Sequence, residues 1–237
     1  YFPIIKKKSR YFNTSRKGAE LIKYASNAFL ATKISFINEI ANLCEKTGVD
    51  IKDVSQGMGL DERIGDRFLR AGPAYGGSCF PKDTRALIDT GNKFKTDLTI
   101  VKSVVNSNDN RKTLLIKRVV KILGGNLKNK IITFLGVTFK PNTDDMREAT
   151  SIPMIKYLNK KNSKIKYYDP SGEKDDFKGL KNVNYCNTIP SACLNADMVI
   201  LHTEWNDFKL LNFKKLVNKQ KFKIYDMRNM YSPLRMK

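Results

Sequence analysis

Apolar residues change their spacing at Gly124-Gly125, and this change limits the chain to a fold of two unlike parts. In the long segments before these glycines, apolar residues recur every three or four positions, which is the period of an amphipathic helix. After the glycines, short apolar runs alternate with helical stretches, a pattern typical of a parallel sheet covered by helices. The sequence therefore predicts an α/β protein in which a helical part precedes a parallel sheet.

The first part is expected to contain one unusually long helix, from residue 15 to about residue 46. Gly48 suits the position just after its C-terminus. Its apolar residues cover more than one face, which favours packing both within the subunit and against a partner. Four further helices are predicted at residues 51–56, 61–69, 81–92 and about 98–123.

The second part is expected to contain five strands, at residues 131–139, 165–168, 183–185, 198–202 and 222–225. Helices are predicted at residues 152–160, 190–195 and 210–216. Ligands of parallel α/β sheets bind beyond the carboxyl ends of the strands. The residues that follow these strands are therefore candidates for a binding site: Lys140, the acidic run 144–148, Trp205 and Arg228.

The strongest chemical signal is the segment Gly-Gly-Ser-Cys-Phe-Pro-Lys-Asp at residues 76–83. Its glycines let the backbone approach a bound ligand closely. Pro81 suits the first helical position, so Cys79 is expected just outside a helix N-terminus. The helix end and Lys82 both favour the thiolate, which is the nucleophilic form of cysteine. An isolated cysteine is more often a small buried hydrophobe, but these neighbours favour a nucleophile.

The formal net charge of +21 is typical of proteins that bind nucleic acid. The lysines are spread along the whole chain, without an arginine-rich arm or an aromatic RNA-binding motif, so a solvated basic surface is favoured and nucleic acid is an unlikely partner. No apolar run is long enough to span a membrane and no signal peptide is recognisable, so the cytoplasm is the expected location. Four cysteines without C-x-x-C spacing, and a single histidine, predict no metal site.

The run at residues 72–83 resembles the catalytic loop of the UDP-glucose 6-dehydrogenases, within the UDP-glucose/GDP-mannose dehydrogenase family. Residues 19–39 resemble that family's central helix, and residues 61–65 resemble a third block. Similarities to its C-terminal domain follow in the expected order at residues 139–140, 144–148, 203–205 and 226–228. Several ordered blocks make a specific signal, far stronger than one short motif.

The resemblance implies three segments in this chain. Residues 1–15 would connect to an upstream domain, residues 16–126 would form a helical central domain that dimerises and carries the cysteine loop, and residues 127–237 would form a Rossmann-like UDP-sugar-binding domain. The G-x-G-x-x-G turn that holds the pyrophosphate of NAD does not occur in the sequence. We therefore expect the chain to be a truncated form, inactive without an upstream NAD-binding domain.

Three residues besides Cys79 are candidates for catalysis. Lys23 and Asn27 are spaced i and i+4, so they project from one helix face, where an ammonium and a carboxamide can bind a developing alkoxide. Asp83 is the expected group to position or deprotonate a water molecule, alone or with Lys23. The alternatives are a solvated helix face for Lys23 and Asn27 and a helix N-terminal charge for Asp83.

The resemblance also implies contacts to ligands. Arg63 would reach the site of the neighbouring subunit, and Lys82 and Arg147 would face NAD. For Arg147, an ion pair with a nearby carboxylate in the run 144–148 is an equally weighted alternative. The remaining substrate contacts would come from Lys23, Asn27, Phe68, Leu69, Arg70, Ala71, Gly72, Gly76, Lys140 and Arg228.

The implied activity is the oxidation of UDP-glucose to UDP-glucuronate with two NAD per turnover. Cys79 would capture the aldehyde as a thiohemiacetal, and a thioester would then be hydrolysed by water. Alternatives remain open: oxidation of GDP-mannose or another nucleotide sugar, a non-catalytic dimerising protein that binds nucleotide sugars, or a basic nucleic-acid binder. Ala74 stands where the family usually has glycine, and alanine would cost about 1 kcal/mol if that position needs a positive φ.

Overall fold

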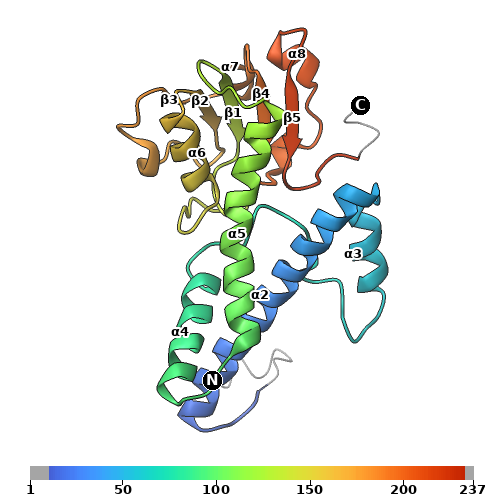
Figure 1. Ribbon diagram of the computed structural model, residues 1–237, viewed down its shortest axis with the longest axis vertical. Coiled ribbons are helices and arrows are strands. Elements are labelled where there is room, and N and C mark those ends of the chain that lie inside the picture. Colours follow the sequence, from blue (N-terminus) through green and yellow to red (C-terminus); the bar gives the residue numbers. More distant parts are fainter. Residues whose placement is uncertain (1–10, 233–237) are drawn as a thin grey trace.

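The structure is a computed structural model that describes residues 11–232. Four helices form the lower part of the molecule in Figure 1. They are α2 (Arg16–Thr47), α3 (Ile51–Gly59), α4 (Phe80–Lys93) and α5 (Thr99–Ile122). Ser15 caps α2 by accepting a hydrogen bond from the Gly18 N–H at 3.1 Å. Gly48 ends the helix in the left-handed conformation, with φ of 75°. The predicted long helix is confirmed, whereas residues 1–10 of the expected connector lie outside the described residues.

The helix predicted at residues 61–69 is wrong. The segment makes one turn, in which the Gly65 N–H donates to the Asp61 carbonyl at 2.8 Å, and then leaves the helical conformation. Gly65 and Phe68 have φ of 67° and 66°, and such left-handed residues interrupt a helix. After this turn the chain runs from α3 towards the sheet as a loop without regular secondary structure.

Five parallel strands form the upper part, in the order β3-β2-β1-β4-β5. Their bounds are β1 (Ile131–Leu135), β2 (Lys164–Tyr168), β3 (Val183–Tyr185), β4 (Met198–Leu201) and β5 (Lys223–Asp226). The predicted parallel α/β sheet is confirmed. The first strand is shorter than expected, because Gly136 turns the chain out of β1 with φ of 75°.

Helices cover both faces of the sheet. The end of α5 and α6 (Ser151–Lys160) pack on one face, and α7 (Ile189–Cys193) and α8 (Phe213–Val217) pack on the other. Two 3-10 turns, η1 (Asp175–Phe177) and η2 (Asn206–Phe208), contribute one buried phenylalanine each. The predicted helix at residues 210–216 begins later, because Asn212 caps α8 by accepting from the Lys215 N–H at 3.2 Å.

Helix α5 belongs to both parts of the molecule. Near its start, Val104 packs with Ala31 of α2 in the helical part. Further along, Leu115 and Val119 enter the core on one face of the sheet. Figure 1 shows this helix running without a break from the lower part to the upper part. The loop that carries Cys79 and the sheet are therefore both attached to α5.

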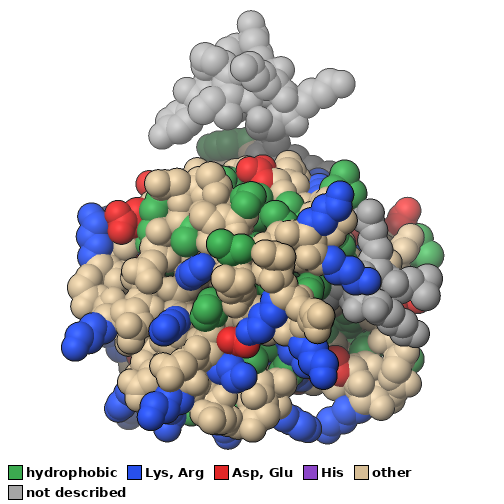
Figure 2. Space-filling view, turned by 90° about the horizontal axis from the view of Figure 1, so that it is seen from above, with side chains coloured by type: hydrophobic (Ala, Val, Ile, Leu, Met, Phe, Trp, Pro, Cys, Tyr) green, Lys and Arg blue, Asp and Glu red, His purple; other side chains and the backbone are tan. Residues whose placement is uncertain are grey.

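Lysine and arginine side chains are scattered over the end of the molecule seen in Figure 2, with a few carboxylates between them. The view matches the dispersed basic surface expected from the sequence, without a continuous positive stripe on this face. None of the helices in the described range 11–232 is both long and apolar enough to cross a membrane.

Candidate active site

Arg228 lies where the strand order of the sheet reverses. Its Nε donates to the carbonyl of His202 and its Nη2 to the carbonyl of Phe139, each at 2.8 Å. The Glu204 carboxylate lies 2.8 Å from the same Nε. Burial lowers the pKa of Arg228, and the charges of Glu204 and Asp226 oppose this effect. Ligands of doubly wound sheets bind at such a reversal point.

A cavity of about 610 Å³ opens between this edge of the sheet and the loop formed by residues 68–76, called here the pocket loop. Lys140 and Arg228 line the side of the sheet. On the other side, the Phe80 ring meets Phe68 and Tyr75 edge to face, with centroids 6.0 and 6.1 Å apart. Aromatic walls and two cations suit a ligand that combines rings with negative charge.

Most of the predicted substrate contacts line this cavity: Phe68, Leu69, Arg70, Gly72, Gly76, Lys140 and Arg228. Ala71 does not line it, although Leu69, which packs in the same hydrophobic cluster between α2 and α3, does. Ser55 and Gln56 of α3, with Asp66 and Arg67, also line the cavity. Nothing in the sequence pattern singled these four out. A larger cavity of about 1020 Å³ beside the edge strand β5 contains none of the predicted site residues.

Cys79 is exposed and lies directly before the first residue of α4, as predicted. Its carbonyl accepts the Asp83 N–H at 2.8 Å, which fixes the first turn of the helix. The Ser78 hydroxyl lies 3.6 Å from its sulfur. Gly76 and Phe80, on either side of it in sequence, both line the cavity. Cys79 itself is not among the residues that line the cavity, so its exposed thiol is adjacent to the lining residues in sequence.

Asp83 is the centre of a polar cluster and its side chain is fully buried. Asn27 Nδ2 donates to Oδ2 at 2.6 Å and Lys82 Nζ to Oδ1 at 2.7 Å, while Lys23 Nζ lies 3.9 Å from Oδ2. Burial alone would raise the pKa of Asp83, but the hydrogen bonds from Lys82 and Asn27, with the charge of Lys23, lower it overall. The structure thus brings the three predicted partners of Cys79 together, and Lys82 with them.

Arg63 and Arg147 lie outside the cavity. Arg63 is highly exposed and pairs with Asp61 at 2.6 Å. Arg147 pairs with both oxygens of Asp145, at 2.9 and 2.8 Å, which is the alternative weighed in the sequence. Solvent screens the exposed guanidinium groups, so pairs of this kind contribute little to stability. The charges of Arg147 and Lys82 both interact with Cys79.

The two glycines at residues 76 and 77 also let other parts of the chain pack closely against this loop. A Cβ on Gly76 would lie 2.6 Å from the Glu148 carbonyl oxygen, and a Cβ on Gly77 would lie 2.7 Å from the Phe139 ring. The Gly77 N–H donates to the Arg147 carbonyl at 2.8 Å. The glycines are therefore required because the sheet part packs closely against this loop, not only for access by a ligand.

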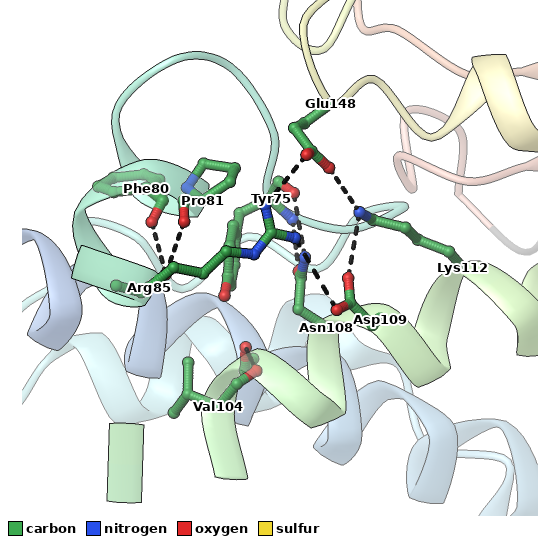
Figure 3. Close-up of polar contacts among 11 residues, drawn as sticks. Tyr75, Phe80, Pro81, Arg85, Val104, Asn108, Asp109, Lys112 and Glu148 are labelled. Carbon is green, nitrogen blue, oxygen red and sulfur yellow. Dashed lines mark hydrogen bonds and ion pairs between the residues drawn. The ribbon is translucent and has the colours of Figure 1, made fainter. Parts of the chain in front are cut away.

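An ion-pair network also stabilises the packing of the sheet part against the helical part (Figure 3). Glu148, which follows β1, pairs with Arg85 of α4 at 3.2 Å and with Lys112 of α5 at 3.0 Å. Lys112 also lies 3.2 Å from Asp109. The hydrogen bond from Lys112 is the main cause that lowers the pKa of Glu148. The network ties the helix that begins beside Cys79 to the sheet part.

Two further expectations can be compared with the structure. His202 is packed, as predicted: burial and the charge of Arg228 lower its pKa to about 3, so it is neutral. Ala74 is absent from the residues with positive φ, so its methyl group causes no backbone strain. Within residues 11–232, no cluster of three His, Cys, Asp or Glu side chains suitable for a metal ion is found.

Comparison with known proteins agrees with this arrangement. Residues 17–110 match the central domain of the UDP-glucose/GDP-mannose dehydrogenase family, and residues 133–233 match the UDP binding domain of that family. A UDP-glucose 6-dehydrogenase of Rhizobium meliloti is 44% identical over 232 residues, which is 98% of this chain and 53% of that protein. One of Rickettsia prowazekii is 45% identical over 232 residues, or 97% of this chain and 54% of that protein.

The fold agrees as well. The structure of a UDP-glucose dehydrogenase from Pyrobaculum islandicum superposes with a TM-score of 0.81 at 34% identity, covering 90% of this chain and 48% of that one. The chain belongs to the UDP-glucose/GDP-mannose dehydrogenase family and contains its central and UDP-binding domains. It spans about half the length of the relatives that it matches.

Proposed function

We propose that this chain supplies the UDP-sugar pocket and the catalytic cysteine of a UDP-glucose 6-dehydrogenase, which oxidises UDP-glucose to UDP-glucuronate. One observation carries the proposal. An exposed cysteine at a helix start follows a loop that lines a cavity of about 610 Å³ together with Lys140 and Arg228. In the first turn of the same helix, a buried carboxylate accepts hydrogen bonds from Asn27 and Lys82 and lies 3.9 Å from Lys23. The boundary between the two proposed domains lies near residue 127.

In this proposal the cavity binds the nucleotide. The diphosphate lies against Lys140 and Arg228, and the rings of Phe68 and Tyr75 contribute the apolar wall. Arginine suits this task because its planar guanidinium can make paired hydrogen bonds to phosphate oxygens. The sugar then extends past Gly76 towards Cys79.

The residues around Cys79 have separate tasks. The thiolate attacks the aldehyde carbon to give a thiohemiacetal, and water later hydrolyses the thioester. Lys23 and Asn27 stabilise the oxyanion of each step. Because the pKa of Asp83 is lowered, we assign to it the orientation of these donors and of the water rather than proton abstraction.

NAD is proposed as the oxidant, and two NAD molecules, bound one after the other, would accept one hydride each. Lys82 and Arg147 are exposed cations whose charges interact with Cys79, so they suit the pyrophosphate of a dinucleotide beside the thiol. Arg147 would exchange its carboxylate partner for that phosphate.

A cytoplasmic location stays a prediction from the sequence.

The function is tested with the 237-residue chain itself. We expect calorimetry to show weak binding of UDP-glucose, in the high micromolar range or weaker, and absorbance to show no NADH formation. Positioning of the nicotinamide near the sugar carbon requires more than Lys82 and Arg147. Formation of NADH by this polypeptide alone would refute the expectation of a missing domain, and preference for GDP-mannose would overturn the substrate assignment.

We further propose that the chain forms a homodimer through α2. Ile22, Phe29, Phe36 and Leu43 recur every seven residues along α2 and are 48%, 66%, 46% and 57% exposed. Such a spacing places them on one side of the helix, where a partner would cover them. We expect Phe29→Glu to convert the dimer into a monomer in light scattering.

The control for this prediction is Leu210→Glu, which charges an apolar residue in the sheet part that is 79% exposed, more than Phe29, and far from α2 in sequence. It should leave the dimer intact. A monomeric wild-type chain at micromolar concentration would count against both the dimer and the role of Arg63 in the neighbouring site.

A further inference from the structure

The backbone of the pocket loop is held by side chains rather than by a helix or a strand. The Gly72 N–H donates to Asn38 Oδ1 at 2.8 Å, and the Gly72 carbonyl accepts from Arg111 Nε at 2.7 Å. Three residues further on, Asn108 pairs with both backbone groups of Tyr75, at 2.9 and 3.2 Å (Figure 3). Two positions of the loop are thus fixed from α2 and α5.

These three polar side chains are buried, and burying polar groups costs free energy. Asn38, Asn108 and Arg111 are only 2%, 4% and 9% exposed. Among residues 11–232, Arg111 makes no ion pair with a carboxylate, and its Nη1 donates to the carbonyl of Asn38 and to Asn42 Oδ1, each at 3.0 Å. Burial lowers its pKa to about 10, so it is still charged at neutral pH. A buried cation bonded only to neutral oxygens is poor for stability, which suggests another role.

The held backbone lies directly against the ligand site. A Cβ placed on Gly72 would be 2.9 Å from Arg228 Nη1, so the guanidinium rests on the α carbon of this glycine. The Tyr75 ring contacts Phe80 on the aromatic side of the cavity. Any displacement of Gly72 or Tyr75 would therefore move the arginine or the aromatic wall.

We propose that Asn38, Asn108 and Arg111 are positioning residues for the nucleotide-sugar pocket, which they shape by holding the backbone of Gly72 and Tyr75. They act through Arg228 and the aromatic wall and do not touch the ligand. The assignment of a ligand to the pocket rests on the proposed function, whereas the ordering of the loop can be measured without any ligand.

The test uses the full chain and two readouts, hydrogen exchange of the pocket loop without ligand and titration with UDP. Arg111→Met is expected to speed exchange at residues 68–76 and to weaken UDP binding by roughly 10- to 100-fold, as expected when a buried hydrogen-bonding group loses its partner. Arg118→Met is the matched control. Arg118 lies two turns further along α5 and bonds Asn42, Glu45 and Tyr225, with no hydrogen bond to the pocket loop among the described residues.

A second pair of variants separates positioning from packing. Asn38→Leu removes the acceptor for the Gly72 N–H and should behave like Arg111→Met. Asn38→Asp keeps an acceptor oxygen at the same place, and the replaced Nδ2 has no partner among the described residues, so it should retain loop protection and affinity. A structural role alone would not distinguish these two variants once both are folded.

Loop exchange that Arg111→Met leaves unchanged would overturn this proposal, as would equal weakening of UDP binding by Arg118→Met. A wild-type chain that binds no UDP would instead overturn the proposed function, and loop exchange would then decide the positioning role by itself.

Discussion

Replacing Cys79 by serine, in an enzyme that joins this chain to an NAD-binding domain, is expected to stop release of the acid product. The exposed sulfur stands at the start of α4, and the proposed function assigns to it the attack on the substrate. A serine hydroxyl is not ionised near neutral pH and gives no thioester, so turnover should fall by at least about 10³-fold, as in other enzymes that lose their nucleophile. Product and trapped intermediate are measured by mass spectrometry, and UDP binding should be unchanged.

Cys186→Ser is the control for this prediction. Cys186 is partly buried at the end of β3 in the sheet part, and burial raises the pKa of its thiol, so it is suited to packing rather than attack. This variant should turn over normally. Normal steady-state turnover by Cys79→Ser would reject the covalent role of Cys79.

Gly136→Ala is expected to have the largest effect on stability. Gly136 follows β1 at the point where the strand order reverses, with φ of 75°, and an added Cβ would lie 2.5 Å from the Thr203 Cβ. The substitution combines left-handed strain of about 1–2 kcal/mol with overpacking of about 1–3 kcal/mol, so we expect a loss of roughly 3 kcal/mol or more. Urea unfolding followed by circular dichroism measures it.

Gly179→Ala isolates the strain from the overpacking. Gly179 has φ of 77°, yet a Cβ added there would meet no atom within 4 Å. This variant should therefore lose only about 1–2 kcal/mol. Similar losses in the two variants would show that contact with Thr203 is not what excludes a side chain at residue 136.

Local sequence signals predicted most of the fold. Ser15 and Gly48 mark the ends of α2 because capping depends on residues adjacent to the helix. The prediction at residues 61–69 failed because its outcome depends on distant contacts. The chain must leave the helix there to bring residue 68 to the cavity, and left-handed Phe68 is tolerated only where tertiary packing holds it.

The candidate site was predicted unevenly. The i, i+4 spacing placed Lys23 and Asn27 on one face, but only the folded chain shows that Asp83, 56 positions from Asn27, accepts from it. Asn38 and Arg111 were missed because polar residues within a helix usually face solvent. The available signal was the helical spacing of Arg111, which lies seven residues after Val104 and four before Leu115 and so shares their buried face of α5.

Helix α5 has a consequence for how the molecule can move and unfold. Its 24 residues extend for about 36 Å and contribute to the cores of both parts. Bending the sheet away from the loop that carries Cys79 would require breaking hydrogen bonds inside this helix, so the two parts cannot open as a hinge around the candidate site. The two parts therefore share one cooperative unit, and damage to either core lowers the melting temperature of both.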